Sequence, residues 1–220
     1  MEIQPTILTG WNVEFFDVNY LYNRAQQVVG KEVANVLSPI GQVQWSDFSK
    51  RYKIAGVSVL DYLALYKTFT FGQRSSYRLD AIGEYEVGEK KVAYDGTLNE
   101  LYENDIDKFV EYNLQDVKLV KKIDDKLNFI EIGRGLAHLG HCPYEDVFMA
   151  SRYLEGAILV YLKKKNIVAP NKPKRPSKFS NDKFVGAYVQ EPIKGKHEWV
   201  YDLDITSMYP SCIISLNISP

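Results

Sequence analysis

The stretch GWNVEFFDVNYLYNR, residues 10–24, passes from a strand pattern to a helix pattern within a few residues. The preceding TILTG completes a short apolar run that reads as a buried strand ending at Gly10, where the backbone can turn freely. From Asp17 onwards, apolar residues recur at helical spacing up to Gly30, namely Val18, Leu21, Tyr22, Ala25 and Val29. We therefore expect a strand, a turn and a helix that begins at or near Asp17.

Asp17 at such a helix start has two interpretations. Ligands of open α/β sheets gather outside the strand ends, so a carboxylate there is well placed to bind a metal ion. A carboxylate at a helix start is also a good N-cap, because the exposed N–H groups and the helix dipole favour it. Taken alone, this segment favours the cap.

The segments that follow predict hairpin and helix elements. Residues 42–60 hold two strand-like runs around the polar SDFSK, which indicates a β-hairpin. Short helices are expected over 60–69 and 75–87, the second beginning at a serine cap, and a long helical stretch runs from Thr97, a cap residue, to about residue 128. A further helix is expected over 144–166.

Tyr112 and Asp116 lie four residues apart in this long helical stretch and therefore share a face. A carboxylate that binds a metal and a phenol that donates a hydrogen bond can jointly position a metal-bound water, and hard carboxylate oxygens suit Mg²⁺ or Mn²⁺. The alternative is a tyrosine packed among core residues beside a solvated aspartate.

The segment VYDLDITSMYPS, residues 200–211, carries a second pair of acids. Asp202 and Asp204 are two residues apart, so on a strand they would point to the same face. Paired carboxylates on a strand are how a two-metal phosphoryl-transfer site begins, whereas an exposed edge strand with two solvated acids is the alternative. We expect strands of a new sheet in this region, with a helix after Pro210 as a further option.

The stretch APNKPKRPSKFSND, residues 169–182, is rich in proline and lysine and is the best candidate for a linker between two units. Over residues 163–196, ten basic residues stand against two acids, although the whole chain has a net charge of −1. Such clustering can mark contact with a phosphate backbone, and it is also common in linkers that are simply solvated.

Composition limits the class of protein. The 220 residues are 45% hydrophobic and 25% charged, which supplies a core and excludes wholesale disorder. The two cysteines, Cys142 and Cys212, lack the spacing of a zinc site or a disulfide framework, which favours the cytoplasm. No apolar run approaches the roughly 20 residues that span a bilayer, and the N-terminus does not resemble a signal peptide, so we expect no membrane partner.

Three segments together resemble one family. GWNVEFFDVNYLYNR, YNLQDV and DLDITSMYPS resemble, in order, the second and third exonuclease motifs and motif A of family B DNA polymerases. The intervening GVSVLDYLALYK, SYRLDAIGEYEV and FVGAYVQEPI look most like the replicative polymerases of T-even-type bacteriophages. The resemblance covers nearly the whole chain, and three motifs in family order weaken the alternative interpretations together.

For the exonuclease motifs, the resemblance implies roles residue by residue. Asp17 and Asp116 match metal-binding aspartates, and Tyr112 matches the tyrosine that orients the attacking water. Asn12 and Phe16 match positions beside the bound DNA strand end. The hairpin over residues 42–54 matches the family element that helps to separate primer from template.

For the polymerase motifs, Asp204 rather than Asp202 aligns with the aspartate that holds both metals. Tyr209 aligns with the residue beneath the incoming sugar, which excludes a 2′-OH, and its neighbours in the nucleotide-binding segment are Ile205, Ser207 and Met208. The FVGA segment matches a family segment that touches single-stranded template, and its DNA-binding positions are Phe184, which replaces a tyrosine, Gly186 and Ala187.

The resemblance implies an α/β fold in three parts. Residues 1–128 would form a partial ribonuclease-H-like 3′–5′ exonuclease core whose N-terminal strands are missing. Residues 129–170 would form a helical connecting segment, which belongs to the N-terminal domain in the family, and residues 171–220 the first strands of a polymerase palm.

The family's Asp-x-Glu motif, motif B lysine and motif C Asp-Thr-Asp do not occur in the expected places, so each active site would keep only part of its carboxylates. We therefore expect a fragment of a DNA-directed DNA polymerase that is inactive alone. The intact enzyme would use two Mg²⁺ or Mn²⁺ ions per site, a DNA primer-template and dNTPs, and would reach a sliding clamp only through the absent C-terminal region. The alternatives are a non-catalytic DNA-binding or assembly piece that a partner chain completes, and a free-standing exonuclease.

Overall fold

The computed structural model describes residues 5–94, 96–171 and 186–218. The chain separates into two compact units, Met1–Asn171 and Lys172–Pro220, and each is described by itself. The first unit is a mixed α/β structure with few strands. In the described part of the chain, no helix combines the length and the apolar character needed to cross a membrane.

Four short strands form two separate pairs in the first unit. Strands β1 (Ile7–Gly10) and β4 (Ser58–Asp61) pair in parallel, with Gly10 opposite Asp61. Strands β2 (Val43–Ser46) and β3 (Arg51–Ile54) pair antiparallel, which confirms the predicted hairpin. The parallel pair brings residues from two distant parts of the sequence to one strand edge.

The hairpin is shorter than the sequence pattern indicates. The run RYKIAGVSVL does not form one strand, because it divides at Gly56, whose φ is +86°. This left-handed conformation favours glycine, and a Cβ here would also lie 2.6 Å from Cγ of Pro39. The chain therefore leaves the hairpin at Gly56, and β4 is free to join β1.

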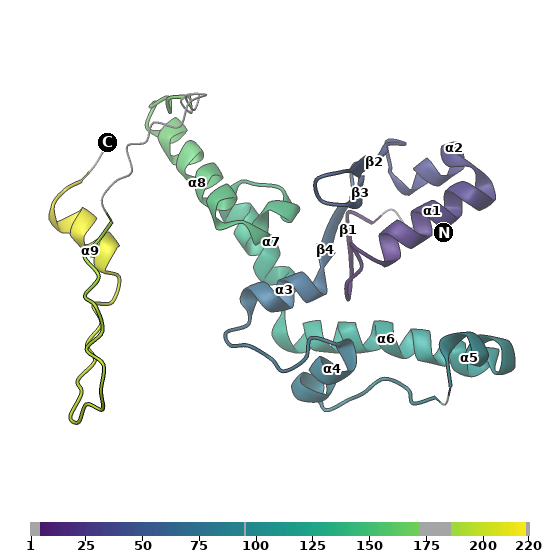
Figure 1. Cartoon of the computed structure of the whole chain (residues 1–220). Helices are drawn as coiled ribbons and strands as arrows, with labels where there is room; N and C mark the ends of the chain where they lie inside the picture. Colours follow the sequence, from purple (N-terminus) through teal and green to yellow (C-terminus); the bar gives the residue numbers. More distant parts are fainter. Residues whose placement is uncertain (1–4, 95, 172–185, 219–220) are drawn as a thin grey trace. The chain divides into compact units, whose positions relative to one another are not determined.

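Helices surround these strands in the first unit (Figure 1). Their bounds are α1 Asp17–Val29, α2 Lys31–Ala34, α3 Tyr62–Phe69, α4 Leu79–Val87, α5 Leu98–Asn104, α6 Ile106–Leu127, α7 Phe129–Gly140 and α8 Ala150–Lys164, with 3₁₀ turns η1 Asn35–Leu37 and η2 Tyr144–Phe148. Helix α7 lies within residues 129–170, which the sequence predicts to be helical, but its bounds were not predicted, and η2 replaces the start of the helix expected from residue 144.

Local capping signals explain where several helices begin. The predicted cap at Thr97 is confirmed as a capping box, in which Thr97 Oγ1 accepts the Glu100 N–H and the Glu100 carboxylate accepts the Thr97 N–H. The expected long helix breaks at Asp105, whose carboxylate accepts the Lys108 N–H at 3.0 Å and caps α6. The predicted serine cap of α4 is wrong, because Arg78 occupies the N-cap position.

The main core joins β4 to the helices α3, α4, α6 and α7. Its fully buried members include large side chains, among them Leu60, Tyr62, Leu65, Tyr66, Ile82, Leu119 and Ile123. Helix α6 runs beside α4 and α5 and supplies Leu119 and Ile123 from one face (Figure 1). Each such side chain stabilises the fold by about 1.5–3 kcal/mol relative to an exposed position.

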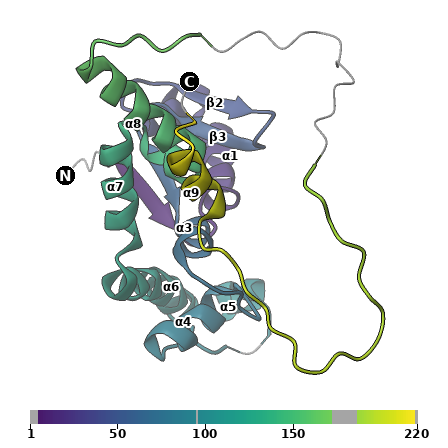
Figure 2. The same ribbon diagram turned by 90° about the vertical axis from the view of Figure 1, so that its left-hand side faces the viewer.

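A smaller core lies between α1 and the hairpin. Val13, Val18, Ile54, Val57 and Val59 are buried together there. Strand β3 packs on α1, and Figure 2 shows the hairpin beside this helix. The hairpin is therefore anchored to the element that begins at Asp17.

Helices α7 and α8 cross at two glycines. A Cβ on Gly156 would lie 2.0 Å from the carbonyl oxygen of Gly140, and one on Gly140 would lie 2.4 Å from Cβ of Tyr153. The two helix backbones therefore approach more closely than any side chain at these positions would allow.

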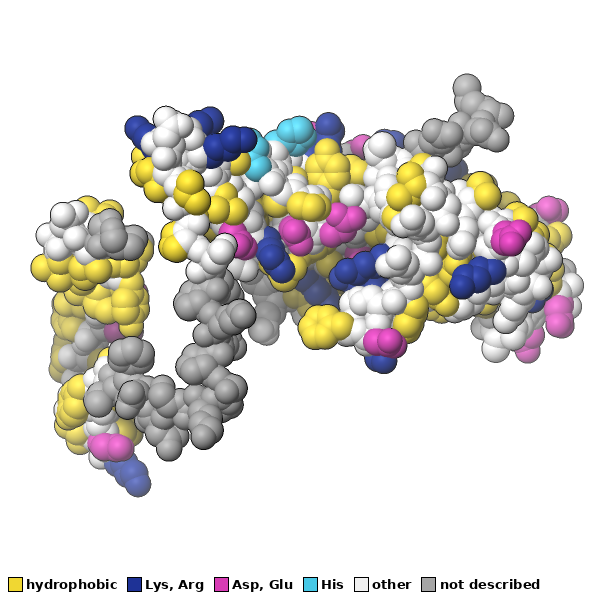
Figure 3. Space-filling model, turned by 90° about the horizontal axis from the view of Figure 1, so that it is seen from above, with side chains coloured by type: hydrophobic (Ala, Val, Ile, Leu, Met, Phe, Trp, Pro, Cys, Tyr) yellow, Lys and Arg dark blue, Asp and Glu magenta, His cyan; other side chains and the backbone are white. Residues whose placement is uncertain are grey.

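Many large apolar side chains remain exposed on the first unit. They include Leu21 and Val28 on α1, Val117 on α6, and Leu154 and Ile158 on α8. Figure 3 shows such side chains interspersed with charged ones over one face. Exposed apolar surface of this extent is typical of surfaces that contact other protein segments.

The second unit differs from the predicted sheet. Residues 186–218 contain no strand, so the strands expected in the region of Asp202 and Asp204 are wrong. The further option, a helix around and after Pro210, is confirmed. Helix α9 spans Met208–Ser215, with Pro210 in its first turn, where its missing N–H costs nothing. A strand needs a partner for its backbone N–H and C=O groups, and among the described residues of this unit none supplies one.

Glu86 gives the first unit a dependence on acid pH. Its carboxylate accepts a hydrogen bond from the Tyr66 hydroxyl at 2.7 Å and forms an ion pair with Lys126 at 3.0 Å, and its side chain is 7% exposed. Burial by itself raises the pKa of Glu86, but these two partners and Arg74 outweigh it and hold the pKa below 4.5. The charged form therefore stabilises the folded state.

We expect acid to weaken the fold through this residue. Because the folded-state pKa lies below the unfolded one, the stabilisation is complete above pH 4.5 and is lost as the pH falls through the folded-state pKa. Urea unfolding from about pH 6 to pH 3 should show a smaller loss of unfolding free energy in Glu86→Gln than in the wild-type chain. Glu84→Gln, on the exposed face of the same helix, is the control, and equal slopes for both variants would contradict the prediction.

Candidate functional site

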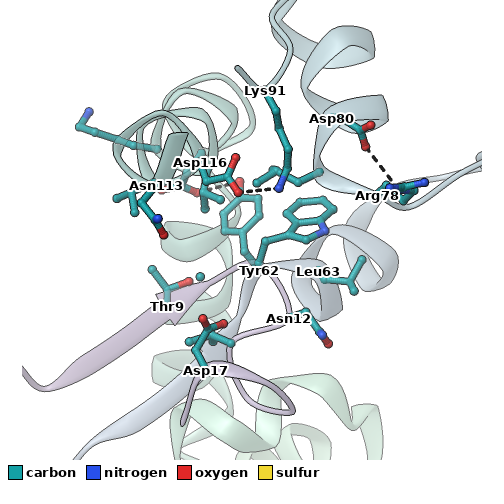
Figure 4. Close-up of a pocket in the computed structure, with 18 of the residues that line it drawn as sticks. Thr9, Asn12, Asp17, Tyr62, Leu63, Arg78, Asp80, Lys91, Asn113 and Asp116 are labelled. Atoms are coloured by element: carbon teal, nitrogen blue, oxygen red, sulfur yellow. Dashed lines mark hydrogen bonds and ion pairs between the residues drawn. The ribbon is translucent and has the colours of Figure 1, made fainter. Parts of the chain in front are cut away.

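A pocket of about 840 Å³ in the first unit brings together the sequence motifs around Asp17 and Asp116 (Figure 4). It is lined by residues from β1, from the turn before α1, and from α3, α4 and α6. Asn12, Asp17, Tyr112 and Asp116, four residues singled out in the sequence, all lie in this lining.

The turn between β1 and α1 is held by one buried carboxylate. Asp61, the last residue of β4, is 3% exposed, and its Oδ1 accepts the Asn12 N–H at 3.1 Å while its Oδ2 accepts the Glu14 N–H at 3.2 Å. The same Oδ1 caps α3 by accepting the N–H groups of Leu63 and Ala64. Asp61 therefore fixes the turn and the start of α3 at once.

Asn12 and Asp17 mark the two ends of this turn. Asn12 has a φ of +62°, a left-handed conformation that asparagine tolerates better than most residues. Asp17 is the first residue of α1, but Phe16 is the N-cap and makes no side-chain cap, so the cap interpretation of Asp17 is wrong. Burial, and secondarily the charge of Asp61, raise the pKa of the Asp17 carboxyl.

Tyr112 and Asp116 share a face of α6, as their spacing predicts, and both contact Lys91. The Lys91 ammonium donates to Asp116 Oδ2 at 2.5 Å and to the Tyr112 hydroxyl at 3.1 Å. Burial alone lowers the pKa of Lys91, but these two partners outweigh it and hold the pKa above its ordinary value. Lys91 is therefore charged at neutral pH.

Asp116 keeps one oxygen free for a ligand. Its Oδ1 is buried and has no hydrogen-bond partner among the described residues, whereas Oδ2 is paired with Lys91. An orphaned buried carboxylate oxygen is costly, and a hard divalent cation such as Mg²⁺ or Mn²⁺ is the kind of ligand that satisfies it. Asp17 and Asp116 line the same pocket from opposite sides, and their carboxylate oxygens are the hard donors that a divalent cation prefers (Figure 4).

The set of ligands is nevertheless small. Among the described residues, no group of three or more histidine, cysteine, aspartate or glutamate side chains is arranged to hold a metal ion. Four aspartates line the pocket: Asp17, Asp80, Asp116 and Asp124. Asp80 faces Arg78 at 3.9 Å, and Asp124 Oδ1 accepts hydrogen bonds from the Tyr62 hydroxyl and the Ile130 N–H, which leaves Asp17 and Asp116 as the candidate ligands.

The remaining predicted residues lie outside this pocket. Phe16 is 65% exposed beside the turn. In the second unit Asp202, Asp204 and Ile205 are exposed in coil, Ser207 is the N-cap of α9, and Met208 and Tyr209 begin that helix. Gly186 and Ala187 are exposed coil, and Phe184 lies outside the described residues.

Sequence reasoning did not select Asp61 or Lys91. Asp61 directly precedes the apolar run of α3, which is an N-cap signal, but its bonds to the turn arise from a partner 49 residues away. Lys91 meets Asp116 across 25 residues, and nothing in EKKVAY distinguishes it from its neighbour.

Comparison with known proteins covers most of the chain. Residues 1–82 match the family model described as DNA polymerase family B, exonuclease domain, and residues 148–220 match DNA polymerase family B. The first segment contains Asn12, Asp17 and Asp61, and the second contains Asp204 and Tyr209.

Individual relatives agree with these matches. The chain is 37% identical to the DNA-directed DNA polymerase of Escherichia phage RB69 over 98% of its length, and 34% identical to that of Enterobacteria phage T4 over 99%. It is 28% identical to a DNA polymerase of Pyrococcus horikoshii. The chain spans 24% of the length of each phage relative. With two segments matching the exonuclease and polymerase parts in order, the chain belongs to the family B DNA polymerases.

Proposed function

We propose that the first unit is the 3′–5′ proofreading exonuclease part of a replicative DNA polymerase, and that its pocket binds the end of a DNA strand. One observation carries the proposal: residues of two motifs about a hundred positions apart in the sequence, Asn12 and Asp17 on one side and Tyr112 and Asp116 on the other, line the same pocket. We propose that the parallel pair of β1 and β4 belongs to a core of the ribonuclease-H-like type.

Each of these residues has a separate proposed role in phosphodiester hydrolysis. Asp116 Oδ1 and the Asp17 carboxylate would hold the divalent cations, Mg²⁺ or Mn²⁺, which supply charge stabilisation at the reacting phosphate when bound. Tyr112 orients the attacking water through its hydroxyl, and Lys91 holds both this hydroxyl and Asp116 Oδ2 in place. Asn12, with Phe16 outside the pocket, contacts the strand end.

For the second unit we propose the start of a polymerase palm. Asp204 would bind the polymerase metals, and Tyr209 would lie beneath the sugar of the incoming dNTP, with Ile205, Ser207 and Met208 around the nucleotide. The segment with Phe184, Gly186 and Ala187 would contact template DNA. We propose the functional boundaries 1–128 for the exonuclease, 129–170 for a connecting segment and 171–220 for the palm.

One observation favours a second function for the chain by itself. The described residues contain no cluster of three metal-binding side chains, so two carboxylates would hold the cations alone. Such a site loses position and affinity, and with them most of the catalysis. In this second function the chain binds DNA without turnover, and other polymerase segments or a partner chain would complete the active site. The exposed Lys163, Lys164 and Lys165 at the end of α8 would contribute to DNA binding through their positive charge.

Binding of Mn²⁺ to the purified chain tests the proposed site. Titration followed by electron paramagnetic resonance should show binding that Asp17→Asn and Asp116→Asn each weaken by about tenfold or more. Asp125→Asn removes an exposed carboxylate from the same helix as Asp116 and should leave the binding unchanged. If both pocket variants bind Mn²⁺ as the wild-type chain does, the proposed site is wrong.

Activity separates the two functions. With Mn²⁺ and labelled single-stranded DNA we expect salt-sensitive binding with little degradation and no primer extension. Robust degradation that Asp116→Ala abolishes would show that this chain alone completes the exonuclease site, which would overturn the non-catalytic reading.

A further inference from the structure

The hairpin is tied along α1 by side chains of the helix. Asn19 Oδ1 accepts the N–H of Tyr52 at 3.1 Å, and Asn19 Nδ2 donates to the carbonyl oxygen of Lys50 at 3.4 Å. One turn further on, Asn23 Oδ1 accepts the Tyr52 hydroxyl at 2.8 Å, and the Tyr52 ring lies 4.5 Å from that of Tyr22. Strand β3 therefore keeps a fixed register on the helix that begins at Asp17.

A further contact joins β3 to the turn before the helix. Arg51 forms an ion pair with Glu14, and both side chains are mostly buried, at 29% and 14% exposed. Glu14 lies midway between Asn12 and Asp17, and its own N–H is bonded to Asp61. The turn is thus held on two sides, by Asp61 through the backbone and by the hairpin through the Glu14 side chain.

Arg51 counteracts the burial and the negative charges around Glu14. Burial raises the pKa of Glu14, and the charges of Asp61 in β4 and Glu145 in η2 raise it further, whereas Arg51 opposes them. Without Arg51, Glu14 would be a buried carboxylate among other carboxylates, a state that proteins avoid by moving the group or protonating it. Movement of the Glu14 side chain would displace the turn, and protonation would remove the charge that ties the turn to β3.

We propose that Arg51 is a positioning residue for the metal site: through Glu14 it fixes the Asn12–Asp17 turn, so that the placement of the hairpin sets the placement of the Asp17 carboxylate. The inference rests on the proposed function, in which Asp17 binds a divalent cation.

The test compares two variants of the same strand. Arg51→Met removes the ion pair, while Lys53→Met makes the same change of charge at an exposed position two residues away in β3. We expect Arg51→Met to weaken Mn²⁺ binding by about tenfold, the scale on which groups that orient metal ligands act, and Lys53→Met to leave it unchanged. Arg51→Lys, which restores the charge, should recover part of the affinity.

A double variant excludes a general loss of structure. If Arg51 acts through Glu14, then Arg51→Met combined with Glu14→Gln should bind Mn²⁺ no more weakly than the Arg51→Met variant does, with all variants folded at the working temperature by circular dichroism. Equal Mn²⁺ affinity of Arg51→Met and the wild-type chain would overturn the inference while leaving the proposed function intact.

A second measurement stands apart from metal binding. In ¹⁵N-resolved spectra without metal, Arg51→Met should shift the amide signals of Asn12, Glu14 and Asp17, whereas Lys53→Met should not. If Mn²⁺ binding proves independent of Asp17, the proposed function fails, and these spectra alone decide whether Arg51 positions the turn. Unchanged signals would show that it does not.

Discussion

An Asp61→Ala variant should lose about 3 kcal/mol of unfolding free energy, because one small side chain satisfies four backbone N–H groups in two elements. Alanine removes the N-cap of α3, which is worth about 1 kcal/mol, and leaves the Asn12 and Glu14 N–H groups without their acceptor. Since these two groups hold the turn, we also expect Mn²⁺ binding at Asp17 to weaken by about tenfold or more.

Asp61→Asn separates the two roles of this residue. Its remaining carbonyl oxygen can still cap α3, but its amide group cannot accept the Glu14 N–H, so the loss of stability should be smaller while Mn²⁺ binding stays impaired. Urea unfolding and Mn²⁺ titration measure the two effects. Asp80→Ala, at a half-exposed side chain in the first turn of α4, should change stability by at most about 0.5 kcal/mol. Wild-type stability of Asp61→Ala would refute the proposed clamp.

A Gly156→Ala variant should be destabilised by about 3 kcal/mol or more, or should release α8 from α7. The new Cβ would lie 2.0 Å from the Gly140 carbonyl oxygen, and a backbone atom cannot give way as the end of a flexible side chain can. The intrinsic preference of helices for alanine, worth about 1 kcal/mol, is too small to offset this overlap.

Gly135→Ala is the matched control, because Gly135 lies in α7 with nothing within 4 Å of the added Cβ. It should raise the free energy of unfolding by up to about 1 kcal/mol through the same helix preference. Thermal unfolding followed by circular dichroism compares the pair. A Gly156→Ala chain that melts at or above the wild-type temperature would contradict the close crossing of the two helices.

Local patterns predicted the parts of the fold that neighbouring residues decide. The start of the helical pattern at Asp17, the hairpin and the Thr97 cap depend on residues within a few positions of one another. The spacing of Tyr112 and Asp116 likewise follows from helix geometry alone. Their metal-binding roles stay predictions.

Distant partners decided what the sequence pattern missed. Asp61 bonds to Asn12 in the turn, 49 residues away in the sequence, and Lys91 bonds to Asp116, 25 residues away. The spacing of apolar residues along the chain does not predict contacts between such distant residues. The strands expected around Asp204 failed for the opposite reason, since alternation of apolar residues shows that a segment suits a sheet but does not supply a neighbouring strand. In its absence CIISLNI contributes to a helix.

The parallel pairing of β1 with β4 has a consequence for the order of folding. Thr9 and Leu60, which it brings together, are 51 residues apart, so their meeting closes a long loop, whereas the turns of α6 close over four residues each. Contacts of high sequence separation carry the larger entropic cost and slow the search for the native state. We therefore expect the helices to gain structure early in refolding, and the Asp61 clamp on the Asn12–Asp17 turn to close only in the rate-limiting step.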